Sequence, residues 1–303
     1  MPEIQFSSEV RDAVADGGPI VALESTIFSH LGLPSPANAD ALESCCSVIR
    51  AAGAVPAVTA VLDGRIRIGL DFGEDERILG AARKVAERDV AVAVAQRWEF
   101  GATTVSAAVS IAAAAGVTVF ATGGIGGVHR GAELTGDVSA DLGAIAHHPV
   151  VTVSAGAKAF LDLARTLEYF ETAGVPVLGW RHDWFPAFYT RSSGLRVPTR
   201  VEDAVAVVDI FTQRLRADCG ILVTVPIPES DALEAQVIER AIAEALAECD
   251  AQGISGAAVT PYVLAALARA TEGRSVPANL ALATNNARVA AEIAVAWSAR
   301  TRL

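Results

Sequence analysis

Two strand-like segments in the middle of the chain end in residues that could carry out chemistry. Residues 117–121 and 150–153 are apolar and mostly β-branched, which predicts two short buried strands. Thr122-Gly123-Gly124 follows the first segment, and Ser154 to Lys158 follows the second. Ligands of an open parallel sheet bind outside the carboxyl ends of its strands, so we expect both polar ends to face one crevice. Polar and ionisable side chains are concentrated between the two segments, at His129, Arg130, Glu133, Asp137, Ser139 and Asp141.

Lys158 is the lysine whose position best suits a nucleophile. It follows a predicted strand through the small residues of the sequence S-A-G-A-K. An ammonium group held there is partly desolvated, which favours the neutral amine, and a neutral amine can attack a carbonyl carbon. The alternative is a lysine that extends from the start of a helix into solvent.

Three acidic residues are candidates for proton transfer or metal binding. Glu24 ends the predicted strand 20–23 and precedes a segment with few helix-forming residues, which favours a place in the site over a helix cap. Asp137 and Asp141 could bind a hard cation such as Mg²⁺ or Mn²⁺, with water completing the shell. It is equally consistent with the sequence that these two aspartates cap helices.

The surrounding pattern predicts an α/β protein. Strands and helices alternate along the chain, which is typical of a three-layer α/β/α arrangement with a mixed, mostly parallel central sheet. A turn at Asp63-Gly64 adds an antiparallel hairpin. No break in composition divides the chain, so a single domain over residues 1–303 is expected. Strands are predicted at 20–23, 55–62, 65–69, 90–95, 117–121, 150–153, 175–180 and 220–225, and helices at 8–15, 38–52, 74–87, 105–115, 160–173, 202–217, 232–252, 261–271 and 276–300.

Three other segments carry polar or aromatic groups of uncertain role. Lys84 falls in the predicted helix 74–87, where a lone lysine is normally solvated. The sequence from Gly101 to Thr104 precedes a helix, whose free backbone N–H groups could hold a phosphate. The loop 181–191 is rich in aromatic residues, which indicates a pocket wall or a subunit contact.

Composition limits the partners of the chain. The formal net charge is −11 over 303 residues, which argues against nucleic-acid binding because phosphate contacts need clustered Lys and Arg. The first ten residues lack the charged start and apolar run of a signal peptide. Glycines interrupt the apolar stretch 104–128, so a membrane helix is not expected there. A small-molecule substrate and a cytoplasmic location are therefore predicted, without nucleic-acid or membrane partners.

Several motifs, in order, resemble one enzyme family over nearly the whole chain. The resemblance is to pseudouridine-5′-phosphate glycosidases, also called the indigoidine synthase A-like family. Its most specific part is the block from Thr122 to Lys158. The motifs are V-A-L-E-S-T-I-F-S-H (21–30), G-A-T-T-V (101–105), T-G-G-I-G-G-V-H-R-G-A-E (122–133), D-V-S-A-D-L (137–142), A-G-A-K (155–158), P-A-F-Y-T-R-S-S-G (186–194) and the N-N-A segment near the end.

The resemblance implies a role for each matching residue. Lys158 matches the lysine that forms an imine with C1′ of ring-opened ribose 5-phosphate, and Glu24 matches the proton donor. Lys84 matches a substrate-contacting lysine, which replaces its interpretation as a surface residue. Asn279 matches the residue that contacts the base. Val105, together with the run Ser139, Ala140 and Asp141, matches sugar-phosphate contacts.

The family also implies a metal and an assembly. Asp137 matches the metal-binding aspartate, with Mn²⁺ the usual ion, and Asp141 is the alternative ligand. The family is typically a homotrimer. These matches imply an enzyme that reversibly splits pseudouridine 5′-phosphate into uracil and ribose 5-phosphate.

Three departures from the family pattern bear on which base, or other carbon acceptor of the ribose, the pocket binds. Val225 stands where asparagine is usual, Phe100 replaces the asparagine of N-G-A-T-T, and the loop H-L-G-L-P is one residue longer. These changes favour a less polar acceptor than uracil. Two alternatives therefore accompany the glycosidase hypothesis. One is a C-ribosyltransferase that joins ribose 5-phosphate to an aromatic natural product, and the other is a non-catalytic sugar-phosphate binding protein.

Overall fold

A mixed eleven-stranded sheet forms the centre of the protein. The computed structural model describes residues 3–254 and 259–302. The main strand order is β1-β4-β3-β2-β7-β8-β11-β9-β10, and β6 and β5 extend from β3. Neighbouring strands are parallel, except that β3 pairs antiparallel with β4 and with β6. The strands are β1 (Ile4–Phe6), β2 (Ile20–Leu23), β3 (Val55–Leu62), β4 (Arg65–Ile68), β5 (Lys84–Val85), β6 (Phe100–Thr103), β7 (Val119–Ala121), β8 (Val151–Ser154), β9 (Val177–Trp180), β10 (Thr199–Val201) and β11 (Ile221–Thr224).

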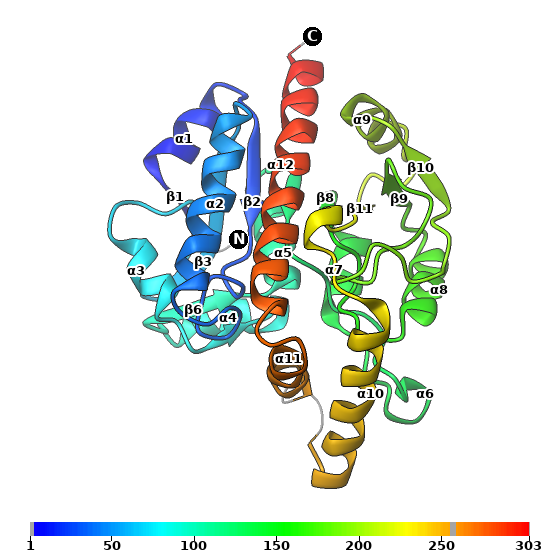
Figure 1. The fold of residues 1–303 in the computed structure, drawn as a ribbon. Helices are drawn as coiled ribbons and strands as arrows, with labels where there is room; N and C mark the ends of the chain where they lie inside the picture. The colour runs from blue at the N-terminus through cyan, green and yellow to red at the C-terminus, as the bar shows by residue number, and fades with distance from the viewer. Residues whose placement is uncertain (1–2, 255–258, 303) are drawn as a thin grey trace.

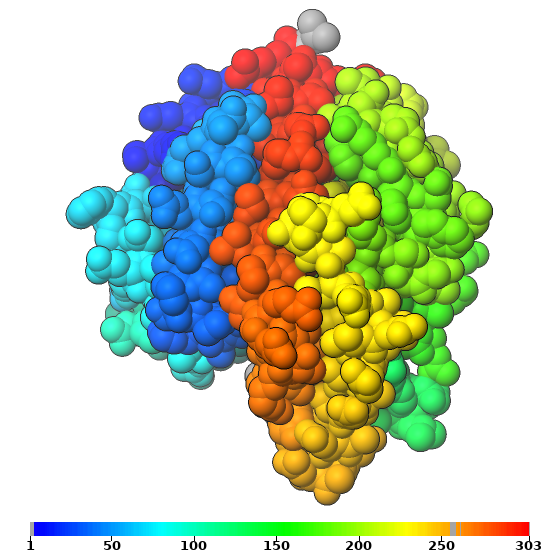
Figure 2. All heavy atoms as spheres, in the orientation of Figure 1, coloured from blue at the N-terminus to red at the C-terminus, as the bar shows by residue number. Residues whose placement is uncertain are grey.

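Helices cover both faces of the sheet, as the alternating pattern predicted (Figure 1). The long helix α12 contacts β2, β7 and β8 on one face, beside α2, and α5 contacts β2 and β7 on the other. In the space-filling view, α12 runs as an orange-red band between the N-terminal and C-terminal halves (Figure 2). The helices are α1 (Ser8–Ala15), α2 (Ala37–Ala51), α3 (Glu74–Leu79), α4 (Glu87–Ala95), α5 (Val105–Ala114), α6 (Ala132–Thr135), α7 (Ala140–His147), α8 (Leu163–Ala173), α9 (Ala204–Thr212), α10 (Ala235–Gln252), α11 (Val259–Ala270) and α12 (Ser275–Thr301), with a 3₁₀ turn at Glu229–Asp231.

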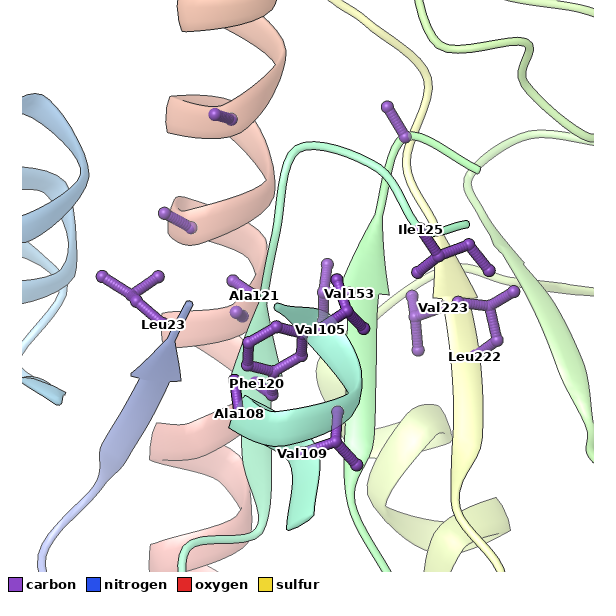
Figure 3. Packing of buried hydrophobic residues seen from close by; sticks show 14 of the residues in the cluster. Leu23, Val105, Ala108, Val109, Phe120, Ala121, Ile125, Val153, Leu222 and Val223 are labelled. Carbon is purple, nitrogen blue, oxygen red and sulfur yellow. The ribbon is translucent and has the colours of Figure 1, made fainter. Parts of the chain in front are cut away.

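Part of the core lies where β7 meets α5. Phe120 of β7 is fully buried and lies against Val105, Ala108 and Val109 of α5 (Figure 3). The small alanines of α5 let the helix approach the sheet closely, and burial of the phenyl ring contributes roughly 1.5–3 kcal/mol. The strand end that carries Thr122 is therefore held by a packed layer rather than by a loop.

The structure confirms many predicted elements and corrects two. The strands 20–23 and 55–62 and the helix 8–15 have the predicted bounds. Residues 90–95 are not a strand but part of α4, because Val90, Ala93 and Val94 face inward at helical spacing. The predicted helix 74–87 ends at Leu79, and Lys84 lies in β5, where it pairs with Ala102 of β6.

Three short strands escaped the sequence pattern. β1, β6 and β10 were not predicted, because three or four residues are too few to show a clear period.

None of the helices that the structure describes combines the length and the apolar character that a membrane span requires.

Candidate active site

The carboxyl ends of three neighbouring parallel strands meet at one edge of the sheet. Glu24 follows β2, Thr122 follows β7, and the turn that leads to Lys158 follows β8. These three side chains line one pocket together with Lys84 of β5 and Asn279 of α12. The free space in this pocket is about 520 Å³, part of it open to solvent. The arrangement confirms the crevice that the strand-end rule predicted.

Glu24 is a buried carboxyl with an unusual affinity for protons. Its side chain is 8% exposed, and the Thr122 hydroxyl donates a hydrogen bond to its Oε1. Burial raises the pKa of Glu24 to about 7, while Lys158, the Thr122 hydrogen bond and Lys84 lower it and the charge of Asp141 raises it. A carboxyl with a pKa near neutrality can both donate and accept a proton at physiological pH.

The turn after β8 directs Lys158 into the pocket. The Lys158 amide donates to the Ile125 carbonyl at 3.1 Å, which ties this turn to the loop after β7. Gly156 allows the approach, because it has a φ of +76° and a Cβ there would lie 2.3 Å from the Pro186 carbonyl oxygen. Lys158 is partly buried and acts electrostatically on both Glu24 and Lys84. Its role as a neutral nucleophile stays a prediction.

Lys84 brings a second ammonium group to the pocket. Much of its side chain is exposed, yet the surrounding protein removes part of its hydration. This desolvation first, and the positive charge of Lys158 second, lower the pKa of Lys84. Two lysines beside a carboxyl suit an anionic ligand better than a neutral one.

Asp141 links three elements around the pocket. It is 7% exposed, and its two carboxylate oxygens accept hydrogen bonds from the Ser106 amide at 3.0 Å and the Gly126 amide at 2.8 Å. Ser139 is the N-cap of α7 and accepts from the Asp141 amide, and Ala140 begins that helix. The bond to Ser106 lies in the first turn of α5, next to Val105. This pattern favours the capping interpretation of Asp141 over that of a metal ligand.

Asp137 lies outside this pocket, in the loop that carries α6. Its Oδ2 is 3.7 Å from Nδ1 of His129, and the His129 amide donates to its carbonyl oxygen at 3.0 Å. Residues 3–254 and 259–302 contain no group of three or more His, Cys, Asp or Glu side chains arranged for a metal. A carboxylate and an imidazole nevertheless suit Mn²⁺ when water or a phosphate supplies the other ligands.

Two asparagines of α12 face the pocket region. The Oδ1 atom of Asn279 is buried and has no hydrogen-bond partner among the described residues. Seven residues further on, the Asn286 amide donates to the carbonyl oxygens of Thr122 and Gly123. The sequence placed Thr122 at the crevice, and the resemblance assigned Asn279 to the base, but neither gave Thr122 or Asn286 an individual role. The position of Thr122 directly after a strand was the available signal for the first.

Apolar side chains form much of the remaining pocket wall, beside Thr26 and Thr260. Phe188 comes from the aromatic loop, as predicted for a pocket wall, and Leu264 comes from α11. Ile27 and Leu31 come from the early loop, so the longer loop does reach the pocket. The other two departures do not reach the pocket. Neither Val225 nor Phe100 is among the residues that line it in the described part of the chain.

Comparison with known proteins places this geometry in a family. The chain matches the family described as indigoidine synthase A like protein over residues 9–296. It belongs to the indigoidine synthase A-like family. The match covers every element that lines the pocket, and it confirms the resemblance found in the sequence.

Relatives in this family are similar along nearly their full length. The chain is 50% identical to a protein of Methylobacterium nodulans named pseudouridine-5′-phosphate glycosidase, covering 97% of this chain and 88% of that protein. A Caldanaerobacter subterraneus protein of the same name is also 50% identical, over 96% of each chain.

Two solved structures share the fold. A prealnumycin C-glycosynthase, solved in complex with ribulose 5-phosphate, superposes with a TM-score of 0.91 at 39% identity, over 99% of this chain and 98% of that one. An indigoidine synthase A-like protein of Thermotoga maritima has a TM-score of 0.87 at 35% identity, over 98% and 97% of the two chains. The three-layer α/β fold with a mostly parallel sheet is thus that of the indigoidine synthase A-like family.

Proposed function

We propose that this protein is an enzyme that reversibly cleaves the C–C glycosidic bond of pseudouridine 5′-phosphate to uracil and ribose 5-phosphate. The observation that carries the proposal is the presence of the buried Glu24 carboxyl and the Lys158 amine in one pocket. The names of the relatives that are 50% identical support the same substrate.

A C–C bond to a base needs covalent help. It has no heteroatom leaving group that an acid could protonate, so acid-assisted hydrolysis alone is inadequate. An amine bonded to C1′ supplies an electron pair that expels the base carbon and forms an imine. Glu24 has the pKa required to deliver and collect protons at neutral pH.

The groups of this chain account for each bond change. As the sugar ring opens, the base loses an N–H proton and supplies the electron pair that breaks C1′–O4′, and O4′ takes a proton from Glu24. The Nζ atom of Lys158 then adds to C1′ and loses a proton. The electron pair of the double bond that ring opening made between C1′ and the base carbon returns to the base, and the base nitrogen regains its proton. When the bond from C1′ to the base breaks, the base carbon keeps the bonding pair and takes a proton, and nitrogen forms a double bond to C1′. Water then adds to C1′ and releases the Lys158 amine and ribose 5-phosphate.

The other residues that match the family would hold the two ends of the substrate, and of these Lys84 and Asn279 line the pocket in the described part of the chain. Lys84 and the segment Ser139, Ala140 and Asp141, with Val105, match the sugar-phosphate contacts of the family. Lys84 supplies the positive charge that a phosphate requires. The unpartnered Oδ1 of Asn279 would accept an N–H of the base, which removes an uncompensated buried acceptor from the described part of the pocket.

Mn²⁺ is the metal that the family implies, with Asp137 as its ligand. His129 lies close enough to join Asp137, and the other positions would be filled by water or substrate oxygens. A bound divalent cation would neutralise phosphate charge. A homotrimeric state and a cytoplasmic location are proposed on the same family grounds. Light scattering at several protein concentrations tests the first, and cell fractionation tests the second.

Borohydride trapping tests the imine directly. Reduction in the presence of ribose 5-phosphate should leave a stable pentose phosphate adduct, which peptide mass spectrometry should locate on Lys158. Lys158→Ala should give no adduct, whereas Lys84→Ala should give it at higher sugar concentration. Absence of an adduct on the wild-type protein would contradict the enzymatic proposal and favour a non-catalytic sugar-phosphate binding protein.

A second function on the same chemistry is the reverse reaction with an aromatic acceptor. The apolar wall of Ile27, Leu31, Phe188 and Leu264 favours it, and so does the structural likeness to a C-glycosynthase. Incubation of the enzyme with ribose 5-phosphate and either uracil or a fused aromatic phenol separates the two functions. Faster product formation with the aromatic compound would support the C-ribosyltransferase.

A further inference from the structure

Asn286 does not line the pocket, but it is hydrogen-bonded to two residues that do, Thr122 and Gly123. It lies on α12, its side chain is 0% exposed, and it is absent from the residues that line the pocket in the described part of the chain. Its Nδ2 donates to the Thr122 carbonyl at 2.8 Å and to the Gly123 carbonyl at 3.1 Å. Two acceptors on one side require the NH₂ group there, so the orientation of this amide is determined by its partners.

The same two residues are held from the sheet side by β8 and its turn. The Thr122 amide donates to the Val153 carbonyl at 3.0 Å, and the Ala155 amide donates to the Gly123 carbonyl at 3.0 Å. The end of β7 is thus held from two sides, by Asn286 of α12 and by the backbone of β8 and its turn. We call this arrangement the clamp. A buried carbonyl that loses its donor is destabilising, so the strand end would shift to recover one.

A shift of this strand end would move Thr122, and with it the hydroxyl that contacts Glu24. Thr122 Oγ1 is on the same residue whose carbonyl Asn286 holds, and it donates to Glu24 Oε1. We infer that Asn286 is a positioning residue that keeps the Thr122 hydroxyl on the Glu24 carboxyl. Asn286 touches neither Glu24 nor the pocket space; it acts through Thr122.

The expected consequence is a change in the ionisation of Glu24. A hydrogen bond from a hydroxyl stabilises the carboxylate, and the Thr122 bond lowers the pKa of Glu24 against the larger effect of burial. Loss of the bond should therefore raise the pKa of Glu24 above about 7. The importance of this effect for catalysis rests on the proposed function, but the ionisation itself does not.

Isotope-edited infrared titration of the full-length protein tests the inference without substrate. Glutamate labelled with ¹³C gives the carboxyl signals, and Glu24→Gln identifies the one that belongs to Glu24. In Asn286→Leu, which keeps a similar volume without the donor, the Glu24 midpoint should rise by about 0.5–1 pH unit. Asn285→Leu is the matched control on the same helix and should leave the midpoint in place.

A double-mutant cycle separates positioning from general loosening of the structure. In a Thr122→Val background, Asn286→Leu should cause no further shift, because the hydroxyl it positions is gone. An unchanged midpoint in folded Asn286→Leu, or an equal shift with and without the Thr122 hydroxyl, would overturn the inference. If Asn286→Leu does not fold, Asn286→Ser takes its place, and the same outcomes decide.

Activity measurements keep this inference distinct from the proposed function. If wild-type protein cleaves pseudouridine 5′-phosphate, the alkaline limb of its rate profile should move to higher pH in Asn286→Leu and not in Asn285→Leu. If wild-type protein releases no uracil, the proposed function fails. The infrared titration would still support or overturn the positioning role of Asn286.

Discussion

The strand ends that carry Glu24 and Thr122 and the loop proposed to hold the metal are built in opposite ways. Glu24 and Thr122 directly follow buried strands, and these residues are 8% and 5% exposed. Asp137 belongs to the loop 129–138, where its side chain is 40% exposed and Leu134 is 89% exposed. This loop carries α6, which extends away from the body of the molecule (Figure 1).

The contrast follows from what each group must do. A carboxyl that donates protons at neutral pH needs to lose water, and a packed layer around it removes that water permanently. An aspartate that helps to hold a hydrated cation can remain near solvent. Substitutions on the buried side should therefore change rate and stability together, whereas those in the loop should mainly change binding.

Removal of Lys158 should have the largest effect. Lys158→Ala eliminates the covalent route, so release of uracil from pseudouridine 5′-phosphate should fall by about 10³-fold or more. Lys84→Ala, in the same pocket, should raise KM more than it lowers kcat. Steady-state kinetics of both variants measure the difference, and equal losses of kcat would argue that neither lysine is the nucleophile.

Glu24→Gln should lower activity by about 10²–10³-fold and yet stabilise the protein at alkaline pH. The pKa of Glu24 is raised from 4.5 to about 7 in the folded protein. Below pH 4.5 both the folded and the unfolded state bind the proton. Between pH 4.5 and 7 the unfolded state releases it first, so the free energy of unfolding falls as pH rises.

The stability difference should level off above pH 7 at roughly 3 kcal/mol, an order of magnitude that follows from the size of the pKa shift. Glu24→Gln cannot ionise and should avoid this loss. Denaturant unfolding of both proteins at pH 5 and pH 8 provides the measurement. A wild-type protein that is equally stable relative to Glu24→Gln at both pH values would show that Glu24 is not a desolvated acid.

Gly126→Ala should destabilise the contact between the loop after β7 and the start of α7. A Cβ at residue 126 would lie 2.1 Å from Ser139 Oγ and 3.0 Å from Asp141 Oδ2. The chain would have to shift, which should cost about 1–3 kcal/mol and weaken the bond from the Gly126 amide to Asp141. Denaturant unfolding checks the stability loss, with Gly131→Ala as a comparison in the exposed loop at a site with open space but a positive φ.

Of these substitutions, Asp137→Asn should change the stability of the protein least. Mn²⁺ affinity, followed by isothermal titration calorimetry, should fall by about tenfold or more. Thermal stability without metal should stay within about 0.5 kcal/mol of wild type, because the side chain is half exposed. Unchanged Mn²⁺ binding in Asp137→Asn would place the metal elsewhere.

Local pattern alone was enough for many elements and for the chemical character of the site. Strands 20–23 and 55–62 were predicted with their observed bounds, because a continuous apolar run between turn residues has few other solutions. The polar residues after β2, β7 and β8 could be assigned to one crevice from the general rule for parallel sheets. Motif order identified the family, which the comparisons confirmed.

Tertiary structure decided which residues meet and how each one ionises. Glu24 and Thr122 are 98 residues apart in the chain, and their hydrogen bond exists because β2 and β7 are neighbours in the sheet. Packing also made residues 90–95 a helix and placed Lys84 on a strand, against their local preferences. Desolvation and hydrogen bonding depend on groups that are distant in sequence, so the raised pKa of Glu24 and the clamp formed by Asn286 could be read only from the folded chain.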